Sequence, residues 1–181
     1  MAKIIDRLPI PVRDDITFVG QDRVHCKADE IIVWVSLSVR KALEWKPGTL
    51  RFPAILDTAH THYFSIQEQH LIRWAGLRPD MLRLLGHVRQ SGRRVPLHAA
   101  NLWLHRNVRG ERDQLRDTPP LLLDLERGIA VYPEEAKFPR LPLVGLRTVR
   151  DNDLHIAIDG EHGWVNLRTP DWRTWLLRWL S

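Results

Sequence analysis

Short segments in which apolar residues alternate with small or polar residues fill most of the chain from Ile31 onward, and this pattern constrains the fold most. IIVWVSLSV alternates in this way, and LRFPAIL follows it after the turn WKPGT. A period of two residues is typical of strands. Further candidate strands are RRVPLHAANLWLH, PLLLDLE, GIAVYP, DLHIAID and GWVNLR, and ITFVG nearer the start. The pattern predicts a mainly β protein, and 181 residues, 44% of them hydrophobic, suffice for one domain with its own core.

Two short helices are expected between LRFPAIL and RRVPLHAANLWLH, and one more at the C-terminal end. Ser65 with Glu68 three residues later resembles a capping box, and Gly76 would end that first helix. A second helix is predicted from Pro79 to Gly86. A third, with a stripe of tryptophan and leucine, would dock on the body of the protein or on a partner subunit. The chain therefore divides into an N-terminal extension or edge strands (1–30), a main domain (31–168) and an amphipathic, Trp-rich C-terminal helix (169–181).

Charge and cysteine content narrow the possible partners and the compartment. The formal net charge is +5, but the 27 basic residues are dispersed among 22 acidic ones. No basic block is present, so binding to nucleic acid is not predicted. Cys26 is the single cysteine, which excludes an internal disulfide and favours a reducing, cytoplasmic location. The charged N-terminal segment does not resemble a signal peptide, and no apolar run has the length of a membrane span.

One carboxylate stands at the end of an apolar strand. Ala54-Ile55-Leu56 leads directly into Asp57 and Thr58, with no Lys or Arg close by in sequence. Burying an unpaired acid costs several kcal/mol, so such an acid needs partners or a function. The simplest structural interpretation is an Asp that caps the following turn or helix. A second feature, Val144-Gly145-Leu146, lies much later and precedes a predicted short helix and a strand.

Together these features resemble the retropepsin-like aspartic peptidases. In that family a hydrophobic strand delivers an Asp-Thr/Ser-Gly loop, and an apolar-Gly-apolar segment packs beside it in a psi-shaped loop. Here Val144, Gly145 and Leu146 would form that segment, and the turn RQSGRR would form the flap, with Ser91 and Gly92 at its tip. The resemblance covers about residues 31–168. It implies an acid-protease barrel with a helical insertion after the catalytic loop and an endopeptidase that acts on peptides or proteins without a cofactor.

The resemblance assigns roles to the residues of the loop. Asp57 would be the catalytic acid, and the Thr58 hydroxyl would bond the opposite loop across a subunit interface. Ala59 replaces the usual Gly but keeps the backbone amide that holds the carboxylate; its methyl group is strained if its φ is positive. Thr61 matches the Ser or Thr often found just beyond the loop. His60 departs from the small residue that is usual in the family.

One such acid per chain implies a homodimer. Asp117-Thr118 is followed by Pro119, which has no amide to donate, and Asp159-Gly160 resembles a turn. The chain is also too short for two lobes of the pepsin type. A two-fold symmetric dimer would bring two copies of Asp57 together.

Two other functions are consistent with the same residues. The chain could be a catalytically inactive retropepsin-like module that binds peptides or dimerises. Alternatively, His60 and His62 on one strand face, with His70 and Asp57, could serve a metal-dependent hydrolase. No further spacing supports a metal shell, so no metal site is predicted.

Overall fold

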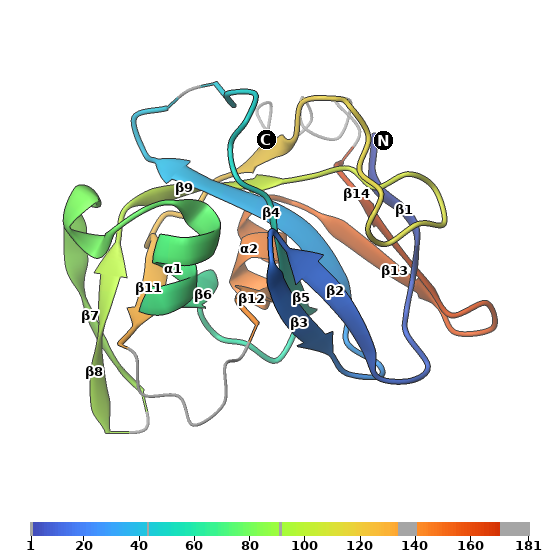
Figure 1. Ribbon diagram of the computed structural model, residues 1–181, viewed down its shortest axis with the longest axis horizontal. Coiled ribbons are helices and arrows are strands. Elements are labelled where there is room, and N and C mark those ends of the chain that lie inside the picture. The colour runs from blue at the N-terminus through green and yellow to red at the C-terminus, as the bar shows by residue number, and fades with distance from the viewer. Residues whose placement is uncertain (1, 43, 91, 134–140, 171–181) are drawn as a thin grey trace, which may run out of the picture.

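The computed structural model describes residues 2–42, 44–90, 92–133 and 141–170 and confirms a mainly β fold (Figure 1). Two α-helices, α1 (Glu68–Ala75) and α2 (Leu146–Asp151), and one 3₁₀ turn, η1 (Pro79–Met81), interrupt the strands. The strands are β1 (Lys3–Pro9), β2 (Asp15–Val19), β3 (Asp22–Cys26), β4 (Ile32–Val39), β5 (Phe52–Asp57), β6 (Phe64–Gln67), β7 (Leu84–Gln90), β8 (Arg93–His98), β9 (Ala100–Leu104), β10 (Leu121–Leu123), β11 (Ile129–Tyr132), β12 (Leu143–Gly145), β13 (His155–Asp159) and β14 (Trp164–Arg168).

Nine strands form one large mixed sheet in the order β10-β9-β4-β5-β12-β6-β11-β8-β7. The expected closed barrel is not observed. Closure requires the two edge strands to hydrogen-bond to each other. Among the described strands, β10 pairs only with β9 and β7 only with β8, so the sheet stays open.

The segment 2–30 contributes to the same hydrophobic core as the rest of the described chain. β1 pairs antiparallel with β14, which also pairs with β13, so a three-stranded sheet joins both ends of the described chain. β2 and β3 form a hairpin that is tied to α1 through Asp22, which accepts a hydrogen bond from Trp74 Nε1 at 2.8 Å and pairs with Arg73. Ile5 and Cys26 lie within the main hydrophobic cluster.

The first predicted helix is present, but its start was wrong. α1 begins at Glu68 after Gln67 and ends, as predicted, at Gly76, which is left-handed with a φ of 66°. Ser65 is not a cap because it lies inside β6, which is paired on both sides, with β12 and with β11. The side chain of Ser65 instead hydrogen-bonds to His60. Pairing on two sides holds this segment extended until Gln67.

The second predicted helix, from Pro79 to Gly86, is wrong. Only the turn η1 forms, and Leu84 already begins β7, which pairs antiparallel with β8. The leucines were spaced as on a helix, but pairing with β8 overrides that local preference. Gly86 has a φ of 151° and lies at a register shift of the β7–β8 ladder, where a bulge needs a residue without a side chain.

The predicted strands after residue 92 are all present, and DGEHG is the turn of the β13–β14 hairpin. The predicted C-terminal helix lies outside the described residues beyond Pro170. Within the described part of the chain, neither helix has the length and apolar character needed to span a membrane.

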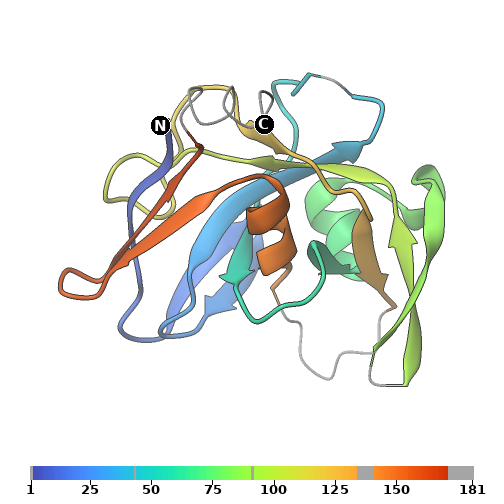
Figure 2. The ribbon, with the colours of Figure 1, turned by 180° about the vertical axis from the view of Figure 1, so that it is seen from behind.

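The two helices lie toward opposite faces of the molecule. In Figure 1 α1 is nearer the viewer, and in Figure 2, seen from behind, α2 is nearer. The loop between β5 and β6, residues 57–63, is called the Asp57 loop. In both views this loop and the free end of the β7–β8 hairpin lie on the same, lower side of the molecule, while the β13–β14 hairpin projects at the other end.

Candidate functional site

Asp57 is the last residue of β5, and its carboxylate is held by its own loop. The five preceding residues of β5 are buried, whereas Asp57 is half-buried. Its Oδ1 accepts a hydrogen bond from the Ala59 amide at 2.9 Å, and its carbonyl accepts one from the His60 amide at 3.1 Å. The strand thus delivers the acid to the surface, and a tight turn fixes its orientation.

Alanine fits the third position of this loop. Among the described non-glycine residues, positive φ angles occur only at Arg7, Asp29 and Asp153, so Ala59 carries no such strain. Its amide makes the hydrogen bond to the carboxylate that a glycine would make. Thr58, Ala59 and Thr61 are exposed. A methyl group on this loop is therefore compatible with a held carboxylate.

β12 lies between β5 and β6, the two strands that the Asp57 loop connects, and hydrogen-bonds to both. It pairs parallel with β5, where Gly145 is opposite Asp57, and antiparallel with β6. The Gly145 amide donates to the Tyr63 carbonyl at 2.8 Å, and the Thr148 hydroxyl donates to the same carbonyl at 2.5 Å. The Leu146 amide donates to the His60 carbonyl at 3.3 Å. These bonds join α2 and β12 to the loop that carries the acid.

Gly145 is required by space. A Cβ at this position would lie 1.8 Å from the His62 carbonyl oxygen and 2.8 Å from that of His60. Both atoms are backbone, which cannot rotate away as a side chain can. The backbone of β12 therefore approaches the Asp57 loop as closely as only glycine permits.

The histidines near Asp57 are used structurally. His60 is buried, and its Nε2 lies 2.9 Å from Ser65 Oγ; its ring meets His62 edge-on with 5.4 Å between centroids. His70 follows β6 in sequence and lies in α1, where its ring stacks on that of Trp74 with 3.7 Å between centroids. Among the described residues, no three His, Cys, Asp or Glu side chains are grouped so that they could hold a metal ion. The metal-dependent alternative therefore has no ligand set in this part of the chain.

His70 should make the protein less stable in acid. Burial, with a smaller contribution from the charge of Arg73, lowers the pKa of His70 to about 4. Because the unfolded chain binds a proton near the ordinary pKa, stability present above about pH 6.5 is lost as the pH falls toward 4. We expect His70→Phe, which keeps a ring on Trp74, to reduce the loss of unfolding free energy between pH 7 and pH 4.5 by about 1–2 kcal/mol. Urea unfolding at both pH values measures this.

The exposed His155 offers the matched control for this change. His155→Phe should leave the pH dependence as in the parent protein. Burial also lowers the pKa of His105 to about 4, so the His70→Phe protein should keep part of the acid sensitivity. An unchanged loss of stability in His70→Phe would contradict the assignment.

A cleft of about 300 Å³ opens beside the Asp57 loop, between that loop and the β7–β8 hairpin. Asp57 itself does not line it; the cleft begins at Thr61, on the C-terminal side of the acid. We call it the arginine cleft. The Asp57 loop contributes Thr61, His62 and Tyr63, the hairpin contributes Val88, Arg89 and Leu97, and Arg127, Gly128 and Arg147 complete the wall.

Tyr63 lines the arginine cleft, and its hydroxyl group connects the Asp57 loop to the end of α2. Its hydroxyl donates a hydrogen bond to Asp151 and lies 3.4 Å from Glu126. The hydrogen bond to the Asp151 carboxylate, together with burial, raises the pKa of Tyr63 to about 12. Tyr63 therefore stays protonated and acts as a fixed donor.

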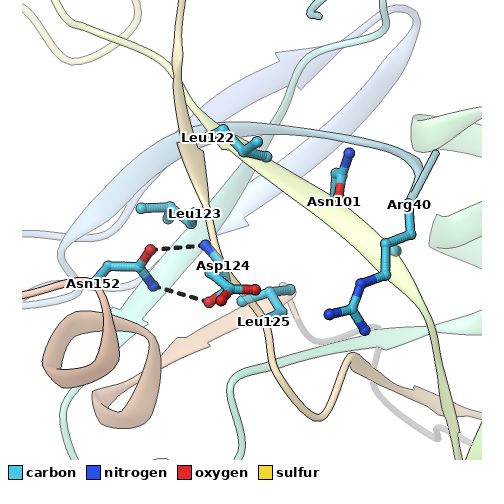
Figure 3. Close-up of a pocket in the computed structure, with 8 residues that line it drawn as sticks. Arg40, Asn101, Leu122, Leu123, Asp124, Leu125 and Asn152 are labelled. Atoms are coloured by element: carbon cyan, nitrogen blue, oxygen red, sulfur yellow. Dashed lines mark hydrogen bonds between the residues drawn. The ribbon is translucent and has the colours of Figure 1, made fainter. Parts of the chain in front are cut away.

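A second hollow, of about 220 Å³, lies near β9 and β10 (Figure 3). The Asn152 side chain clamps the backbone of residue 124 there: Oδ1 accepts from the Asp124 amide at 2.7 Å, and Nδ2 donates to the Asp124 carbonyl at 2.9 Å. Arg40 also lines this hollow. Asn152 is thus used to fasten the end of α2 to the chain after β10, which is a structural role.

The structure brings together most of the residues singled out in the sequence. Asp57, Thr58 and Ala59 form one loop, and Val144 and Gly145 lie beside β5, with Leu146 opening α2. Gly92 lies in the β7–β8 turn with a φ of 78°, whereas Ser91 lies outside the described residues. The three arginines of the arginine cleft were missed. They are far apart in sequence, and no local pattern indicates that they converge.

Comparisons with known proteins do not assign the chain. No protein-family model matches it, and neither a curated protein nor a solved structure matches it.

Proposed function

We propose that the protein is an aspartic endopeptidase of the retropepsin-like type, in which a second copy of the chain completes the active site. Asp57 from each subunit would form a catalytic pair on a two-fold axis. The observation that carries the proposal is the insertion of β12 between β5 and β6, with Gly145 opposite Asp57. This psi-shaped arrangement holds a strand-end acid at the surface with its carboxylate already oriented.

The chemistry follows from two carboxylates that lie a hydrogen bond apart. Two like charges at that distance cannot both persist, so the pair shares one proton and titrates as a unit. The ionised member takes a proton from water, which attacks the peptide carbonyl. The protonated member stabilises the developing oxyanion and gives its proton to the leaving amine. In each subunit the Ala59 amide would hold the carboxylate in place.

The need for a second chain also has structural support. Asp117 is exposed in a loop outside the sheets, and Asp159, at the end of β13, accepts hydrogen bonds from His162 in the hairpin turn. Neither acid is placed as Asp57 is. Thr58 and Ala59 are exposed, and the neighbouring Leu146 is 48% exposed. These three residues offer a surface that a second Asp57 loop could cover.

Mixing subunits tests the proposal. If each site needs two copies of Asp57, adding an equal amount of Asp57→Asn subunits to the parent protein should lower its activity to about half, and a threefold excess to about a quarter, by random pairing in a two-fold dimer. Cleavage of a reduced, unfolded protein is the readout, after the mixture has exchanged subunits.

Activity that does not respond to added Asp57→Asn subunits would contradict a shared site. Activity that disappears with a chelator and returns with zinc would support the metal-dependent alternative instead. Peptide binding without turnover between acidic and neutral pH would identify an inactive module.

A further inference from the structure

We propose that the arginine cleft is a specificity site for an acidic side chain, Asp or Glu, of an extended peptide near the bond to be cleaved. The inference rests on the proposed function and deepens it. Three arginines from three separate elements line this cleft: Arg89 from β7, Arg127 from the turn before β11 and Arg147 from α2. No acidic side chain of the described chain lines it.

These arginines differ from four others that are engaged in ion pairs. Arg73, Arg78, Arg112 and Arg150 each form an ion pair with a carboxylate. Within the described residues, no hydrogen bond or ion pair engages the guanidinium groups of Arg89, Arg127 or Arg147. The pKa of Asp151 is lowered mainly by hydrogen bonds from Arg150 and Tyr63. The charge of Arg147 makes a smaller contribution in the same direction. Within the described part of the chain, the three guanidinium groups of the cleft therefore have no carboxylate partner that would compete with a ligand.

The remaining lining suits the stem of an acidic side chain. Val88, Leu97 and Gly128 supply apolar surface, against which the methylene groups of a glutamate can pack. At about 300 Å³ the cleft is at the small end of ligand sites, which favours a side chain over a whole cofactor. A guanidinium group binds a carboxylate with two parallel hydrogen bonds, a geometry that the neutral amide of glutamine does not match.

The position of the cleft relates it to cleavage. It begins at Thr61 in the same loop as Asp57, and its opposite wall is the β7–β8 hairpin. A peptide that passes between this hairpin and the Asp57 loop would place one side chain in the arginine cleft. The substrate residue whose side chain enters the arginine cleft then lies a few positions from the scissile bond, always on the same side of it.

The test uses the full-length protein and begins with a reduced, unfolded protein as substrate. Mass spectrometry of the products should show Asp or Glu enriched at one fixed position relative to the cleaved bond. A synthetic peptide from one such site is then compared with its Glu→Gln analogue. We expect kcat/KM to favour the Glu peptide by about tenfold, as expected for a charge-assisted hydrogen bond, and the preference should shrink at high salt.

The double variant Arg127→Gln/Arg147→Gln should bring the Glu/Gln ratio close to one. Arg40→Gln/Arg83→Gln removes the same charge from exposed positions outside the cleft and should keep the ratio. Equal turnover of both peptides by the parent protein, or a ratio that the cleft variant keeps, would overturn the inference while leaving the peptidase proposal intact.

Absence of turnover separates the two proposals. In that case the peptidase proposal fails, and fluorescence anisotropy with labelled Glu and Gln peptides decides the cleft. The probes would be synthetic peptides that copy Glu-containing segments of the unfolded substrate protein. Arg-dependent binding that prefers Glu supports an acidic-peptide site, and equal binding of the two peptides overturns it.

Discussion

Replacing Asp57 by Asn is expected to lower the cleavage rate by about a thousandfold or more, because an amide can neither take a proton from water nor share one with a second carboxylate. The side chains have the same size, and the amide oxygen can still accept the hydrogen bond that the Ala59 amide now donates to Oδ1. The fold and the proposed dimer should therefore persist. The measurements are kcat/KM on a fluorogenic peptide and the thermal unfolding temperature of the same preparation.

Asp117→Asn is the matched control for this variant. Asp117 also precedes a threonine, but it is exposed in a loop outside the sheets. Its replacement should leave both turnover and Tm near the parent values. Full turnover by Asp57→Asn would rule out the proposed chemistry, as would an equal loss in both variants with Tm unchanged.

Gly145→Ala is expected to cause a large loss of stability from the addition of a single methyl group beside the Asp57 loop. The new Cβ would lie 1.8 Å from the His62 carbonyl oxygen, so either β12 or the Asp57 loop has to move. Overpacking of this kind costs about 3 kcal/mol or more when backbone must shift. In a domain of this size, that corresponds to a fall in Tm of roughly 10 °C. Chemical denaturation and thermal melting measure it.

Gly160→Ala provides the control for the added methyl group. Gly160 lies in the β13–β14 turn, its φ is not in the left-handed region, and a Cβ added there would have no heavy atom within 4 Å beyond its chain neighbours. Its change in stability should stay within about 0.5 kcal/mol, as for most surface substitutions. If the Tm of Gly145→Ala equals that of Gly160→Ala and the variant keeps full activity, the close approach of β12 to the Asp57 loop does not exist in solution.

Local patterns were reliable where one strand or one turn decides the outcome. The alternation in IIVWVSLSV became β4, and the end of the first helix at Gly76 followed from glycine's ease with a positive φ. Local patterns were unreliable where pairing with a neighbouring strand determines the secondary structure of a segment. Ser65 looked like a helix cap and residues 79–86 looked helical, but pairing of β6 with two strands and of β7 with β8 kept both segments extended.

The amino-acid sequence alone determined that the protein is mainly β and that Asp57 ends a buried strand, because the pattern of apolar residues and the residue that ends a strand are local properties of a few consecutive residues. Only the tertiary structure decided that the large sheet stays open, that Gly145 lies opposite Asp57, and that Arg89, Arg127 and Arg147 share one cleft. Those features depend on which distant strands hydrogen-bond to each other, and the residues of one segment do not specify the distant segment with which it pairs.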